Sequence, residues 1–290
     1  MDIRNILTEP PVVEGGKYLE KIYDLQRDLM AGYIGKIEKS LPNYPISLNS
    51  EKGQLVLKDF SARVIEETAE GYESTSAALQ ILESHGMNLD ALSLEEFDMV
   101  VNHLQNSNEE QADAFAFFVE LMLYANIQFD DIYSYVATKM VNGLRVEDLT
   151  LGHLFEIGAL EYVKREWVEE GHNLFPSISE EMLKAHNLQP KKVFGYIPGF
   201  LRISSSQHEL EDHMLWKVAY HLNLGRNYLK NKTWKQTQEL TDGLRYQSEV
   251  VKAFVAYCGY LQVMGFKPET FYVLFYKKHM VNKFRQKSGY

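Results

Sequence analysis

The stretch EQADAFAFFVELMLYANIQFDDIYSYVATK, residues 110–139, decides the fold class. Its apolar side chains recur every three or four residues, which is the spacing of one buried helix face. It aligns without a gap with EVVKAFVAYCGYLQVMGFKPETFYVLFYKK, residues 249–278, so that Glu110 meets Glu249. Two apolar helices of equal length can match by composition alone, which is the alternative to a true repeat. The stretch predicts helices and, if the repeat is real, an internal tandem duplication.

The same periodicity dominates the rest of the chain, and clean β alternation is nearly absent. Further helices are expected over the stretches 18–41, 55–86, 93–104, 108–127 and 130–144, the first ending before Pro42 and the second near Gly86. The expected fold is therefore an all-α helical bundle. A repeat would divide it into residues 1–144, with acidic motifs, and residues 145–290, with a basic C-terminal helix. The two halves would form a pseudo-dimer and could pack as one domain.

The bulk composition excludes several classes of protein. A net charge of −10 argues against coating a nucleic acid, because that function needs a basic face. The single cysteine, Cys258, allows no disulfide framework and indicates a reducing compartment. The N-terminal residues lack the apolar run of a signal peptide, and the most apolar segment, 114–127, is too short to cross a bilayer. We expect a cytoplasmic protein with no nucleic-acid or membrane partner.

Acidic residues occupy two helical stretches at a spacing of three. Glu67 and Glu70 share one helix face, as do Glu110 and Asp113. If the two helices pack antiparallel, four carboxylates meet at one place, where their mutual repulsion would favour a bound divalent cation. Mg²⁺ fits because it takes a few carboxylates, keeps waters and bridges phosphate oxygens, and Mn²⁺ can replace it. The alternative is a pair of solvated acidic faces, but Asp113 lies where its helix turns apolar.

The C-terminal helix carries a polar stripe. Lys278, Asn282 and Arg285 stand at i, i+4 and i+7. A lysine and an arginine on one stripe can hold a chain of phosphates, and the asparagine can bind a sugar hydroxyl. Basic residues at a helix C-terminus are also favoured by the helix dipole alone.

These motifs together resemble the all-α nucleoside triphosphate pyrophosphatases, which include MazG-like enzymes, dimeric dUTPases and phage dCTP–dUTP pyrophosphatases. The superfamily pattern E-E-x-x-E followed by E-x-x-D is matched by Glu66, Glu67, Glu70, Glu110 and Asp113. The dimeric dUTPase branch ends in K-x-x-x-N-x-x-R-Q-x-x-G-Y, matched by Lys278, Asn282, Arg285, Gln286, Gly289 and Tyr290. The resemblance further implies that Gln26 reads the pyrimidine and that Trp234 and Lys235 lie near the phosphates.

Three departures from the family pattern stand out. The spacer between Glu70 and Glu110 is longer than usual, and the Trp-Lys element follows the E-x-x-D motif instead of preceding it. Met30 stands where many dUTPases have an asparagine, which weakens the case for strict uracil selectivity.

The halves also differ in what they retain. Lys252 aligns with Asp113. Residues 62–74 can also be aligned with residues 218–230, which places Asn223 and Arg226 at the positions of Glu67 and Glu70. We therefore expect a composite site, with metals on the first half and the nucleotide held by the second.

The expected reaction is Mg²⁺-dependent hydrolysis of a pyrimidine deoxynucleoside triphosphate, dUTP first and dCTP next, to the monophosphate and pyrophosphate. The acids would activate a bound water and neutralise phosphoryl charge, with Glu70 or Glu66 as general base. The protein would act as a homodimer or a pseudo-dimeric monomer, in a host cell's cytoplasm if phage-encoded. One alternative is a catalytically inactive nucleotide-binding protein. The other, a di-iron bundle, needs two E-x-x-H pairs, and only Glu169 with His172 offers one.

Overall fold

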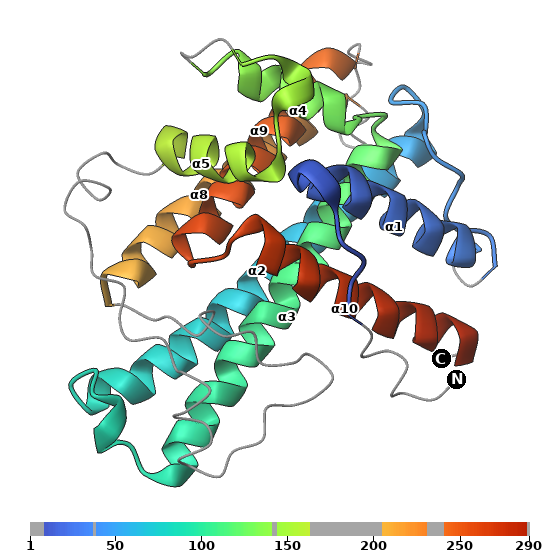
Figure 1. Ribbon diagram of the computed structural model, residues 1–290. Helices are drawn as coiled ribbons and strands as arrows, with labels where there is room; N and C mark the ends of the chain where they lie inside the picture. The colour runs from blue at the N-terminus through green and yellow to red at the C-terminus, as the bar shows by residue number, and fades with distance from the viewer. Residues whose placement is uncertain (1–8, 37–38, 141–143, 163–204, 231–240, 289–290) are drawn as a thin grey trace.

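The computed structural model describes residues 9–36, 39–140, 144–162, 205–230 and 241–288. Within these ranges the secondary structure is helical, and no strand is assigned (Figure 1). The expectation of an all-α fold is confirmed. The described α-helices are α1 (Tyr18–Tyr33), α2 (Glu51–Ser84), α3 (Leu94–Tyr124), α4 (Phe129–Ala137), α5 (Leu151–Tyr162), α8 (Ser205–Tyr228), α9 (Gly243–Val263) and α10 (Pro268–Ser288).

Several expected helix boundaries were wrong. The helix expected over 130–144 ends at Ala137, and the helix expected from residue 55 begins at Glu51. The helix expected to run from residue 18 to 41 ends at Tyr33, shortly before Gly35, whose φ of 70° is left-handed and incompatible with a continuing α-helix. The separate helices expected over 93–104 and 108–127 are one helix, α3, because no proline or glycine interrupts the chain between them. The serine cap was correct, since Ser93 accepts a hydrogen bond from the Glu96 amide.

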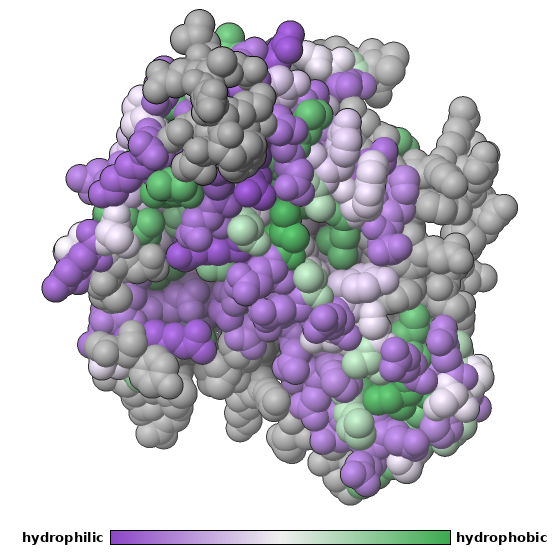
Figure 2. All heavy atoms as spheres, turned by 180° about the vertical axis from the view of Figure 1, so that it is seen from behind, coloured by the Kyte–Doolittle hydropathy of each residue, from purple (hydrophilic) through white to green (hydrophobic). Residues whose placement is uncertain are grey.

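Helices α2 and α3 form a long antiparallel hairpin that projects from the body of the molecule (Figure 1). Beyond the buried hydrogen bond between Thr75 and Ser107, residues 76–106 form an arm with its own small core. The arm makes up most of the spacer between Glu70 and Glu110. Figure 2 shows a largely hydrophilic surface, with one of its small hydrophobic patches on the arm at lower right.

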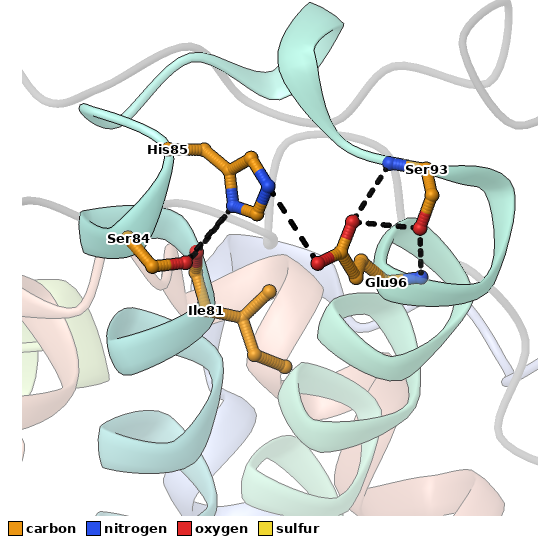
Figure 3. Close-up of polar contacts among 5 residues, drawn as sticks. All are labelled: Ile81, Ser84, His85, Ser93 and Glu96. Carbon is orange, nitrogen blue, oxygen red and sulfur yellow. Dashed lines mark hydrogen bonds and ion pairs between the residues drawn. The ribbon is translucent and has the colours of Figure 1, made fainter.

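Polar side chains hold the end of the arm together (Figure 3). The Ser93 hydroxyl caps α3, and the Glu96 carboxylate accepts from the Ser93 amide in return, which makes a capping box. The other Glu96 oxygen lies 3.6 Å from His85 Nε2, at the end of α2. The two helix ends are therefore joined across the turn.

Helices α3 and α9 meet through aromatic side chains that would be counterparts in the predicted repeat. Phe115 contacts Phe254 with ring centroids 5.1 Å apart, and Phe118 contacts Tyr257 at 5.2 Å. The cross pairs, Phe115–Tyr257 and Phe118–Phe254, are also in contact, at 6.2 and 5.6 Å. Such reciprocity is what a two-fold relationship between two similar surfaces produces. One continuous hydrophobic core contains residues of both halves.

The turns that follow α3 and α9 have the same construction. Asn126 and Gly265, 139 residues apart, both take a left-handed φ, of 58° and 88°. The Ile127 amide donates to the Met122 carbonyl, and the Phe266 amide donates to the Leu261 carbonyl at the same separation. These features favour the tandem duplication, which stays a prediction. As for a membrane, no described helix is both long and apolar enough to cross one.

Candidate metal and nucleotide site

Helices α2 and α3 bring three acidic residues together. Glu67, Glu70 and Glu110 each offer a carboxylate oxygen, and these oxygens lie within 4.8 Å of one another. Gly71 permits this approach, because an added Cβ there would lie 2.2 Å from Gln111 Nε2 and 3.5 Å from Glu110 Cβ. A carboxylate-rich oxygen site of this kind suits a hard divalent cation.

The cluster is electrostatically unfavourable without a cation. Burial, the neighbouring charge of Asp113 and a hydrogen bond with Glu110 raise the pKa of Glu67 to about 8. Burial also raises the pKa of Glu110. The protonated form is therefore favoured at Glu67 and Glu110 relative to solvated glutamates, and a divalent cation bound there would compete with the proton.

Asp113, the fourth predicted ligand, is outside this group of three. Its Oδ2 lies 2.6 Å from Lys278 Nζ, and the same ammonium lies 2.5 Å from Glu109 Oε1. Lys278 is only 5% exposed. Burial raises the pKa of Asp113, against the lowering effect of Lys278 and, further away, of Arg285. The last helix thus places Lys278, one of its predicted phosphate-binding residues, in contact with acids of the first half.

Two predicted substrate-binding glutamines are engaged within the fold. Gln26 is buried, and its Nε2 donates to Glu120 Oε1 at 2.5 Å, which joins α1 to α3. Gln286 Nε2 donates to the Leu29 carbonyl at 3.2 Å, and its side chain packs on Gly32. These contacts give both glutamines a structural role in fixing α1 against its neighbours.

The remaining predicted residues divide into two groups. Asn282 is half-buried, whereas Glu66 and Arg285 are exposed, as solvent-accessible groups at the mouth of a site would be. Trp234, Lys235, Glu169 and His172 lie outside the described residues. Gly289 and Tyr290, the end of the terminal motif, lie outside them as well.

Two carboxylates that bind predicted site residues lie outside the predicted motifs. Glu109 holds Lys278 together with Asp113, and its position next to Glu110 was the only available signal. Glu120 is 4% exposed and binds Gln26. A single acidic residue inside the apolar run 114–127 indicates a buried polar partner, but it does not say which one.

A pocket of the described residues lies away from the acidic cluster. A pocket of about 500 Å³ lies between the α3–α4 turn and the start of α9, and Asn126, Asp131 and Gln247 are among its lining residues. None of the predicted site residues is among the residues that line it.

The second half places different residues at the positions of the acids. Buried positions along α2 and along α8 with the residue after it recur at a constant separation of 154, with Phe60, Val64, Thr68, Gly71 and Thr75 matching Met214, Val218, Leu222, Gly225 and Leu229. The burial pattern fits the predicted separation of 156 less well, because that separation would set buried Thr68 against a half-exposed position and Gly71 against exposed Asn227. In a true repeat with this separation, Glu67 would correspond to His221 and Glu70 to Leu224.

Comparisons of the chain with protein-family models, with curated proteins and with solved structures find no match. The resemblance to the nucleoside triphosphate pyrophosphatases therefore rests on the motifs and on the geometry described above.

Proposed function

We propose that the protein is a divalent-cation-dependent hydrolase of nucleoside triphosphates, with pyrimidine deoxynucleotides, dUTP before dCTP, as substrates. The observation that supports this most directly is the convergence of Glu67, Glu70 and Glu110 beside the Lys278–Asp113 ion pair. A metal ion on the three acids would bind phosphate oxygens and lower the pKa of a water molecule. Water adds to the phosphate chain, one P–O–P linkage breaks, and the monophosphate and pyrophosphate leave.

The chain's own residues have distinct roles in this proposal. Glu70, exposed at the edge of the cluster, or Glu66, one turn away, accepts the proton of the attacking water. Lys278 and Arg285 neutralise the phosphate chain, and Asn282 binds the sugar. Gln26 fixes α1 through Glu120 and in that way shapes the wall on which the base would rest.

The test is a panel of deoxynucleoside triphosphates with Mg²⁺ or Mn²⁺, scored for the monophosphate and pyrophosphate. Release of both products in equal amounts from dUTP or dCTP is expected, and Glu110→Gln should remove it. A folded wild-type protein that leaves every triphosphate intact would contradict hydrolysis.

A second function is a nucleotide-binding protein without catalysis. The ion pair of Asp113 with Lys278 favours it, because that contact removes one predicted ligand from the metal. Nucleotide binding by calorimetry without product release would support this alternative.

A further inference from the structure

Helices α8 and α9 place a second cluster where the repeat positions a counterpart of the acidic site. Glu67 and Glu110 interact across α2 and α3. The residues at the corresponding positions, His221 and Glu249, interact across α8 and α9, with His221 Nδ1 2.7 Å from Glu249 Oε2. The same two helix faces therefore meet in both halves.

The backbone beneath the second cluster also matches. Gly71 packs against Glu110, with an added Cβ lying 3.5 Å from Glu110 Cβ. Gly225 packs in the same way against Glu249, at 3.4 Å from Glu249 Cβ. The two helix pairs thus approach closely at equivalent glycines, each directly beside an aligned glutamate.

The charges, however, are reversed around Glu249. Its Oε1 lies 2.6 Å from Lys252 Nζ, and Lys252 stands at the position of Asp113. Its Oε2 is bound by His221, at the position of Glu67. Both carboxylate oxygens are therefore engaged by the protein, and Leu224 replaces the third acid, Glu70. Burial alone would raise the pKa of Glu249, but the contacts with Lys252 and His221 hold this pKa below its usual range.

We propose that His221, Glu249 and Lys252 lie at the counterpart of the first metal site, and that the side chains of His221 and Lys252 there take the place of a metal ion. The chain then binds a divalent cation on α2 and α3, while the related position on α8 and α9 is neutralised internally. This inference extends the proposed metal site. It explains how Glu249 can remain in a buried position, at 6% exposure, without a metal ion.

The proposal predicts that substitutions can create metal binding at the second position. The variant His221→Glu/Leu224→Glu/Lys252→Asp restores an acid at each corresponding position. It is made in a Glu67→Gln/Glu110→Gln background, which disables the first site, and Mn²⁺ binding is measured by electron paramagnetic resonance and calorimetry. We expect at least a tenfold gain in Mn²⁺ affinity over the background, and a further Glu249→Gln substitution should abolish the gain.

Two controls keep the test decisive. In the otherwise unchanged protein, Glu249→Gln should leave Mn²⁺ binding intact, and loss of binding there would overturn the proposal. A folded triple variant that gains no Mn²⁺ affinity would also overturn it. If the triple variant fails to fold by circular dichroism, the single Lys252→Asp variant decides, with the same tenfold gain expected. Failure of the proposed function is distinguishable, because it appears as absent Mn²⁺ binding to the unmodified protein.

Discussion

Lys278 Nζ on α10 lies 2.6 Å from Asp113 Oδ2 on α3, so the last helix of the chain is joined to the acidic site of the first half. Glu109 accepts from the same ammonium. Two carboxylates thus compensate one buried cation, and neither half contains the complete arrangement by itself. A site assembled in this way depends on the packing of α10 along α1 and α3.

Replacement of Lys278 by methionine tests this arrangement. The change leaves Glu109 and Asp113 without their shared counter-ion, and removing one partner of a buried pair costs roughly 3–5 kcal/mol. We expect a clear loss of stability in the metal-free protein, partly recovered with Mn²⁺, because a cation can then bind Asp113 without competition. Urea unfolding with and without Mn²⁺ measures both effects. Lys277→Met, at the neighbouring position of α10, is the matched control. Unchanged stability of Lys278→Met would contradict the ion pair.

Glu67→Gln tests the protonated acidic cluster. Folding raises the pKa of Glu67 from 4.5 to about 8, so the folded protein binds this proton more tightly than the unfolded chain. The stability contributed by Glu67 is therefore present below pH 4.5 and is lost as pH rises towards 8. Glutamine imitates the protonated form, so the metal-free variant should be more stable than wild type at pH 8 and should bind Mn²⁺ weakly.

The measurement for Glu67→Gln is urea unfolding at pH 5 and pH 8, together with an Mn²⁺ titration. Exposed Glu73, two turns along α2, gives the control Glu73→Gln, which should alter neither quantity. Wild-type Mn²⁺ affinity in Glu67→Gln would rule out Glu67 as a ligand.

Much of the fold followed from local patterns in the chain. Apolar spacing identified the helices, and Ser93 and Gly86 marked where two of them begin and end, because caps and left-handed glycines act locally. The end of α1 was misplaced because its amphipathic spacing continues beyond Tyr33 into a segment where Gly35 turns the backbone. Periodicity alone carries no information about such a turn.

The site was only partly accessible to the same reasoning. Spacing placed Glu67 with Glu70, but the contact of Lys278 with Asp113 depends on how α10 crosses α3, which no local pattern determines. The sequence alignment of α2 with α8 differs by two residues from the alignment that burial favours, because the two helices share few residue types. Their buried positions reveal the alignment only in three dimensions. The pairing of Gln26 with Glu120 likewise required the structure.

His279→Met tests a buried histidine beside the α1–α10 contact. Burial and the charge of Lys283 lower its pKa from 6.5 to about 4. The unfolded chain therefore takes up a proton at higher pH than the folded protein, so stability is full above pH 6.5 and falls as pH drops towards 4. The shift corresponds to about 3 kcal/mol. Urea unfolding between pH 4 and 7 should show a flatter profile for His279→Met than for wild type. The control His103→Met, on the arm, should keep the wild-type slope.

Substitutions of Arg285 test whether its guanidinium group binds the phosphates of the substrate. A hydrogen bond to a charged group contributes roughly 1.5–3 kcal/mol, so Arg285→Ala should lower kcat/KM about ten- to a hundredfold. Arg285→Lys keeps the charge but loses the planar fork, so it should fall between wild type and Arg285→Ala. Arg285 is exposed, so all variants should melt as wild type does. The control Lys287→Ala removes a nearby exposed charge from the same helix and should retain full activity. Equal activity in all four proteins would show that Arg285 binds no phosphate, whereas parallel losses of activity and melting temperature would assign it a structural role.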